Sequence, residues 1–204
     1  MKQVKKRLRS EHMILESARQ LIAEKGCEKT TFAELMKATG LSKGAIYHYV
    51  TGKDDLMAKL LQNLTLEKNE QLFYQLSAGE KTLLNPADVL ARQLKAIEDP
   101  DKIIGKIFVY LVSRSEHQTA KDALDEFYES LFQFAVLWIR SGQQNGTIPR
   151  NTDPYKAAEL FMLILDGFRL RTRLYHSDFF LGSTDLEGVI KRLFGHETAL
   201  FPFE

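Results

Sequence analysis

Residues 30–56 constrain this chain most, because their small, hydroxyl and apolar side chains follow the pattern of a helix, a tight turn and a second helix. Thr31 stands where a helix N-cap belongs, and Glu34, three residues later, completes a capping box. Gly40 follows at the position of a left-handed C-cap residue. The pattern therefore predicts a capped helix that ends at a glycine turn.

A second short helix is predicted over residues 43–50, with Ser42 as its cap. Ile46 and Val50 lie four apart and share one buried face. The other positions then expose two tyrosines and a histidine, from which a globular protein gains little stability. A DNA-reading helix uses such a surface, because small residues allow close approach and hydroxyls and lysine reach phosphates and base edges. The alternative is a helical hairpin inside an ordinary bundle.

One set of residues in this stretch agrees in both type and spacing with a known pattern: Thr31, Gly40, Leu41, Ser42, Gly44, Ile46, Tyr47, Tyr49 and Lys53 through Leu56. Over about residues 10–61 the chain resembles the N-terminal signature of the tetracycline-repressor (TetR) family of bacterial transcriptional regulators. Two residues depart from that signature, since Val50 stands where many members have Phe and Gly52 where a polar residue often precedes the lysine. Both lie at or just beyond the end of the second helix.

The resemblance implies an all-α chain, with an N-terminal three-helix helix-turn-helix DNA-binding domain followed by an α-helical ligand-binding and dimerisation domain. We expect these domains over residues 1–55, with the motif at about 31–50, and over residues 56–204. A helix-turn-helix places its second helix in the major groove. The residues expected to contact DNA are Thr31, Ser42, Lys43, Gly44, Ala45, Tyr47, His48, Tyr49 and Lys53. Of these, Thr31 and Lys53 are expected to hold phosphates, with the two tyrosines beside them, while Ser42, Lys43, Ala45 and His48 face the bases.

The charge distribution is uneven although the net charge is only +1. Residues 1–55 carry 11 Lys and Arg against 7 Asp and Glu, and the rest of the chain carries 17 against 20. A basic head on a mildly acidic body fits a protein that meets phosphate at one end. Five of these cations precede any acid: Lys2, Lys5, Lys6, Arg7 and Arg9. They form either a frayed, solvated terminus or an arm along DNA, and the sequence leaves both open.

Composition and motifs exclude several classes of protein. Hydrophobic residues make up 44% of the chain, enough for a sizeable core. The single cysteine, Cys27, rules out an intrachain disulfide and indicates a reducing compartment, with a buried apolar role expected rather than a redox switch. No apolar run is long enough to span a bilayer, so we expect a cytoplasmic protein without membrane contact. The usual catalytic motifs are absent and the histidines are isolated, so we expect no enzyme, no metal and no cofactor.

Beyond the head, helical periodicity predicts helices over about residues 54–77, 87–97, 101–114, 120–142 and 154–175, and one after Gly182. An aromatic-rich set in these helices is of the kind that lines an apolar ligand pocket: Phe108, Tyr110, Tyr128, Phe134, Trp138, Phe161 and Leu165. Each can equally be plain core. Tyr110 and Trp138 are favoured because a buried Tyr or Trp needs a polar partner, which a ligand can supply.

The charged residues in and near these helices are expected at the protein surface rather than in a ligand site. Arg114 and His117 either orient a polar group of the ligand or sit in solvent, and solvent is favoured. Arg169, with Asp166 three residues before it, is expected to form a helical surface ion pair rather than an anion site.

The last two helices are the expected homodimer interface, with Gly167 allowing close approach of the backbones; the alternative is that both helices complete a monomeric core. The resulting hypothesis is a dimeric repressor of a palindromic double-stranded DNA operator, released by a small, largely apolar effector. The main alternative keeps the DNA-binding head and makes the body a constitutive protein-interaction platform. A further alternative is a ligand carrier or enzyme with a vestigial head.

Overall fold

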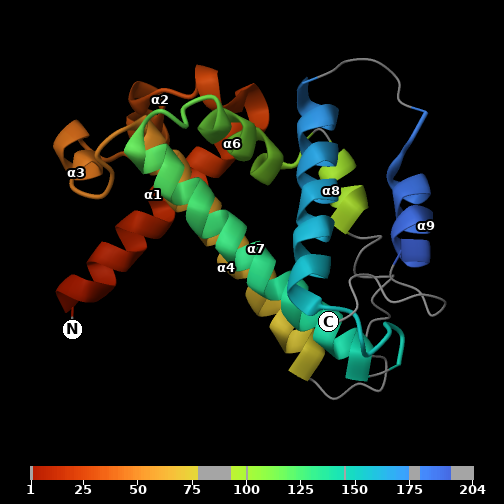
Figure 1. Ribbon diagram of the computed structural model, residues 1–204. Coiled ribbons are helices and arrows are strands. Elements are labelled where there is room, and N and C mark those ends of the chain that lie inside the picture. Colours follow the sequence, from red (N-terminus) through yellow and green to blue (C-terminus); the bar gives the residue numbers. More distant parts are fainter. Residues whose placement is uncertain (1, 78–92, 100, 145, 175–179, 194–204) are drawn as a thin grey trace. The chain divides into compact units, whose positions relative to one another are not determined.

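The computed structural model describes residues 2–77, 93–99, 101–144, 146–174 and 180–193, and these are built from helices (Figure 1). The helices are α1 (Lys2–Lys29), α2 (Phe32–Thr39), α3 (Lys43–Tyr47), α4 (Lys53–Ser77), α6 (Ile103–Val112), α7 (Gln118–Gln144), α8 (Pro154–Leu174) and α9 (Ser183–Leu193). Residues 93–98 are also helical, and the earlier part of the helix expected over 87–97 lies outside the described residues. No strand occurs in the described ranges, so the predicted all-α class is confirmed. None of the helices described is both long and apolar enough to cross a bilayer.

The chain divides into two compact units. The first comprises residues 1–66 and 101–127, and the second comprises residues 67–100 and 128–204. Helices α4 and α7 each contribute residues to both units. All nine residues expected to contact DNA belong to the first unit.

Helix α2 begins and ends as the sequence predicts. The Thr31 hydroxyl accepts a bond from the Glu34 amide at 3.4 Å, and the Glu34 carboxylate accepts the Thr31 amide at 3.2 Å, which completes the capping box. Gly40 has φ 69°, and its amide donates to the Met36 carbonyl at 2.9 Å. Lys25 of α1 also pairs with Glu34. Hydrogen bonds from Lys25 and then Thr31 lower the pKa of Glu34 to about 2, and the same contacts tie α2 to α1.

Helix α3 is shorter than predicted. The Ser42 hydroxyl caps it by accepting the Ala45 amide at 3.2 Å, but the helix ends at Tyr47 instead of continuing to residue 50. The next two residues form a turn in which the chain reverses towards α4. Ile46 and Val50 are nevertheless both buried, as expected. Since so short a helix is weakly stabilised by its own backbone bonds, its geometry depends on these contacts.

The core of the first unit joins α1 to the helices around it. Its largest fully buried side chains are Ile14, Ile22, Leu35, Ile46, Met57, Leu60, Leu61, Ile107 and Leu111. Ile14 and Ile22 lie on the buried side of α1, and Gly26, with φ 81°, interrupts this helix near its end. Cys27 is buried, and its burial raises the pKa of the thiol to about 11. A protonated, buried thiol fits the apolar role and not a redox switch.

The core of the second unit centres on α7 and α8. Trp138 stacks on Phe161 with ring centroids 5.2 Å apart. Arg169 pairs with Asp166 at 2.6 Å as expected, but the expectation of a surface pair is wrong because Arg169 is only 4% exposed. The reason is that Arg169 follows the buried Leu165 by four residues and so shares its core-facing side of α8. Burial lowers the pKa of Arg169 and raises that of Asp166.

Candidate nucleic-acid interface

The residues predicted to read DNA lie on one exposed surface around α3. Ser42, Lys43, Gly44 and His48 are exposed, whereas Ala45 and Tyr49 are half-buried. Tyr47 is 42% exposed although it lies next to the buried Ile46. The structure therefore separates α3 into a buried side and a polar, aromatic outer side. We call this outer side, formed by residues 42–45 and 47–49, the α3 surface.

Tyr47 is held in a defined position on the α3 surface. Its ring stacks on Phe32, the first residue of α2, with centroids 5.0 Å apart and planes 20° apart. The Lys43 ammonium lies 5.7 Å from the Tyr47 ring centroid. The first turn of α2 therefore supports a tyrosine of α3, so the two helices of the motif present one joint surface.

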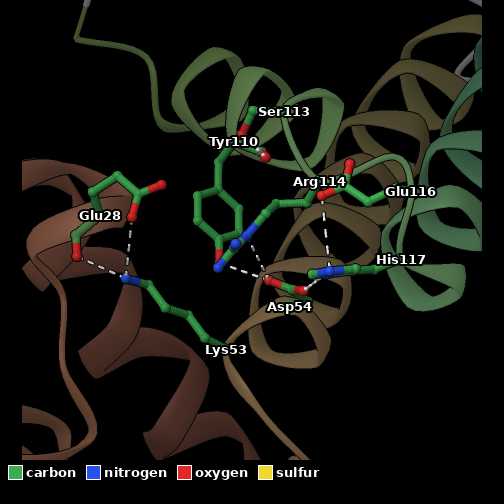
Figure 2. A network of polar contacts seen from close by, with 8 residues as sticks. All are labelled: Glu28, Lys53, Asp54, Tyr110, Ser113, Arg114, Glu116 and His117. Carbon is green, nitrogen blue, oxygen red and sulfur yellow. Dashed lines mark hydrogen bonds and ion pairs between the residues drawn. The ribbon is translucent and has the colours of Figure 1, made fainter.

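Thr31 and Lys53 already have protein partners. Thr31 is exposed, and its hydroxyl donates to the Glu34 carboxylate at 2.7 Å as part of the capping box. The Lys53 ammonium donates to the Glu28 carbonyl at 2.7 Å and lies 5.7 Å from the Tyr110 ring centroid (Figure 2). Lys53 thus caps the end of α1, and the phosphate contacts expected of both residues stay predictions.

The basic N-terminal segment is helical. Residues 2–9 belong to α1, which leaves open whether they form a solvated terminus or an arm along DNA. Arg7 and Arg9 are exposed there. They place two cations on the first turns of a long helix, where contact with DNA phosphate stays open as a prediction.

Sequence reasoning missed a polar cluster around Asp54 (Figure 2). The Tyr110 hydroxyl donates to Asp54 Oδ1 at 2.6 Å, His117 Nδ1 lies 2.9 Å from Oδ2, and Arg114 Nε lies 3.6 Å from Oδ1. Arg114 is half-buried and His117 is exposed, so both stay near the surface as favoured, but each also pairs with the Asp54 carboxylate. Asp54 lies in the first turn of α4, where an acid favours the helix dipole, and no local pattern signals its other partners.

This cluster shifts the pKa values of its members. Burial works to raise the pKa of Asp54, but hydrogen bonds from Tyr110 and His117 and the charge of Arg114 outweigh it and lower that pKa. Burial, followed by the bond to Asp54, raises the pKa of Tyr110 to about 12. Asp54 is thus held as an anion and Tyr110 as a neutral donor at neutral pH. The polar partner that Tyr110 was expected to find in a ligand is Asp54.

The seven predicted ligand-binding residues do not fall in one unit. Phe108 and Tyr110 belong to the first unit, where Phe108 packs on Phe127 at a centroid distance of 5.6 Å. The other five belong to the second unit: Tyr128, Phe134, Trp138, Phe161 and Leu165. Tyr128 is 42% exposed, whereas the last three are core residues. Among the described residues, no group of three or more His, Cys, Asp or Glu side chains is placed to hold a metal.

Two glycines of the motif are expected to respond oppositely to alanine. Gly40 has a left-handed φ of 69°, whereas Gly44 lies inside α3, and an added Cβ at either would meet no heavy atom within 4 Å. Gly40→Ala should destabilise the protein by about 1 kcal/mol through its backbone alone. Gly44→Ala should stabilise it by up to about 1 kcal/mol through helix propensity. Denaturant unfolding followed by circular dichroism measures both, and equal shifts of the same sign would contradict the assigned backbone conformations.

Comparison with known proteins agrees with this geometry. Residues 14–60, which include α2 and α3, match the family model "Bacterial regulatory proteins, tetR family". The chain is 24% identical, over 79% of its length and 77% of the relative's, to the HTH-type transcriptional regulator PksA of Bacillus subtilis (strain 168).

Solved structures share the fold at low identity. The reduced form of E. coli NemR has a TM-score of 0.68 at 18% identity, over 90% of this chain and 96% of that one. A putative transcriptional regulator from Saccharomonospora viridis, solved in complex with choline, has a TM-score of 0.67 at 18% identity, over 91% and 95%. Taken together, the matched segment, the related regulator and the shared fold support a transcriptional regulator of the TetR family.

Proposed function

We propose that this protein is a dimeric repressor that binds a palindromic operator and is released by a small, largely apolar ligand. The observation that carries the DNA-binding part is the α3 surface, where a supported tyrosine, a lysine, a serine and a histidine surround an exposed glycine. Such a surface permits close approach to base edges in the major groove. Ser42, Lys43, Ala45 and His48 would face the bases, and Tyr47 and Tyr49 would contact phosphates.

Dimerisation through α8 and α9 is supported by an exposed apolar face on α8. Leu163 is 71% exposed and Leu174 is 55% exposed. Gly167 lies between them on the same helical face, and an added Cβ there would meet no described heavy atom within 4 Å. Apolar residues flanking an open glycine suit packing against a second copy of the helix. A dimer would also present two α3 surfaces to two half-sites, as helix-turn-helix proteins require.

Release by ligand would involve the helical body. Trp138, Phe161 and Leu165 are apolar core residues of the second unit, and one protein of the same fold was solved with choline. A ligand that binds better when the heads are not at half-site spacing would shift the population away from DNA. The alternative, a constitutive interaction platform, predicts that no small molecule in a broad thermal-shift screen stabilises the protein.

Selection from a random DNA pool tests the proposed function. The full-length protein should enrich a palindrome, and its affinity for that sequence should fall steeply as salt rises, because phosphate contacts release counterions. Enrichment of no sequence above the starting pool would reject specific DNA binding. It would favour instead a carrier or enzyme with a vestigial head.

A further inference from the structure

Two adjacent aspartates in the first turn of α4 contact different parts of the first unit. Asp55 contacts the turn that follows α3, and Asp54 contacts α6 and the residues just after it. We propose that Asp54 and Asp55 are positioning residues for DNA binding, which fix the first turn of α4 between α3 and α6 and thereby set the direction of α3. This inference rests on the proposed function and assigns to it residues that touch no DNA.

The Asp55 side ties α4 to the end of α3. Asp55 Oδ2 accepts the Thr51 amide at 2.7 Å and the Thr51 hydroxyl at 3.2 Å. Lys59, one turn further along α4, lies 3.4 Å from Asp55 and also donates to the Tyr49 carbonyl. Because α3 ends at Tyr47 and α4 begins at Lys53, these bonds hold Tyr49 and Thr51 within the connection between the two helices. The direction of α3 therefore follows the direction of the first turns of α4.

The Asp54 side ties the same turn to α6. Both carboxylate oxygens are in use, Oδ1 by Tyr110 and Arg114 and Oδ2 by His117 (Figure 2). Tyr110 is only 4% exposed, so loss of its acceptor would leave a largely buried hydroxyl without this bond. A carboxylate that is hydrogen-bonded to Tyr110 and His117 and paired with Arg114 fixes the direction of its helix turn more strongly than a single surface pair does.

These contacts close a ring of helices. Lys106 of α6 donates to the Ala23 carbonyl of α1 at 3.2 Å, and Lys25 of α1 pairs with Glu34 of α2. These contacts thus position α2 relative to α1, and they position α3 relative to α4. The angle between the two helices of the motif then depends on how α4 begins relative to α1. Among these contacts, those of Asp54 connect α4 to α6.

An effect of Asp54 on the position of α3 can be distinguished from a direct effect of its negative charge on DNA. Removing an acidic charge from the head strengthens phosphate attraction, so Asp54→Asn should raise non-specific affinity slightly if charge alone matters. A misdirected α3 instead loses base contacts and lowers specific affinity. The ratio of specific to non-specific affinity therefore reports positioning, and a merely structural role would not move it in a folded variant.

The experiment compares wild type, Asp54→Asn, Tyr110→Phe and the double variant on the selected DNA site and on an unrelated sequence at one salt concentration. We expect specific affinity to fall roughly tenfold in each single variant and no further in the double variant, with non-specific affinity unchanged or higher. Asp125→Asn removes an equal charge from an exposed position of α7 in the same unit and should bind specific DNA like wild type. Circular dichroism verifies that each variant is folded.

Amide hydrogen exchange of the free protein tests the same inference without DNA. Asp54→Asn and Tyr110→Phe should speed exchange of the amides of residues 43–51, and Asp125→Asn should not. Unchanged exchange there, or specific affinity within twofold of wild type in both single variants, would overturn the inference and leave the proposed function standing. If wild type itself binds no specific sequence, the proposed function fails. The exchange measurement alone then decides whether the contact between Asp54 and Tyr110 positions α3.

Discussion

Replacing Tyr47 with alanine is expected to lower affinity for the specific DNA site more than a hundredfold while leaving helical content and oligomeric state unchanged. Tyr47 is exposed on the α3 surface, so its removal takes a DNA contact away and leaves the buried side of α3 intact. Loss of a phosphate contact of this kind, ring and hydroxyl together, costs about 1.5–3 kcal/mol per subunit, and a dimer would lose two of them. Quantitative footprinting of the selected site at fixed salt measures the loss.

Two control variants separate the possible causes of that loss. Tyr47→Phe retains the stack on Phe32 and removes only the hydroxyl, so we expect a smaller loss, of about tenfold. Tyr155→Ala truncates a tyrosine of similar exposure, 51%, in the second unit and should leave DNA affinity unchanged. Footprints of wild-type strength from Tyr47→Ala would show that α3 is not the reading helix.

Leu163→Arg should convert the protein from dimer to monomer. Leu163 is the most exposed apolar residue of α8 in the described chain, and the two-fold axis of a dimer would bring both new arginines into one apolar interface. Buried like charges cost several kcal/mol, enough to dissociate the subunits at micromolar concentration. Sedimentation equilibrium measures the mass directly. Because the heads would no longer be joined, specific DNA affinity should fall together with the mass.

Leu137→Arg is the matched control for this prediction. Leu137 is also an exposed leucine of the second unit, at 45%, but lies on α7. The variant should remain dimeric and bind DNA like wild type. A dimer of unchanged stability from Leu163→Arg would place the interface elsewhere, and a monomeric wild type would reject the dimer altogether.

The parts of the fold that the sequence predicts well are encoded within a few residues. Thr31 and Glu34 make the capping box and Gly40 takes the left-handed conformation, because each depends on neighbours at most four residues away. Ile46 and Val50 are both buried as predicted, although Val50 lies beyond the end of α3, where its amide donates to the Ile46 carbonyl. The length of α3 was less predictable, since its end depends on where the chain must turn to enter α4.

Contacts between residues that are far apart in the sequence cannot be predicted from local sequence patterns. Asp54 meets Tyr110 and His117 across 56 and 63 residues, whereas local pattern indicates only that an acid in a first helical turn favours the helix dipole. Residue type similarly predicts that an aromatic side chain is buried but does not identify its neighbours. The aromatic set expected to line a ligand pocket includes residues of both units, and its role stays a prediction, whereas Arg169, taken for a surface residue, is buried.

Methylation protection of guanine N7 on the selected DNA site tests the central claim, that α3 reads base edges, most directly. N7 lies in the major groove, where the second helix of a helix-turn-helix binds. The account predicts protected guanines in two half-sites centred about 34–36 Å apart, with protection lost in Tyr47→Ala. Protection confined to the backbone, or equal protection by wild type and Tyr47→Ala, would contradict it.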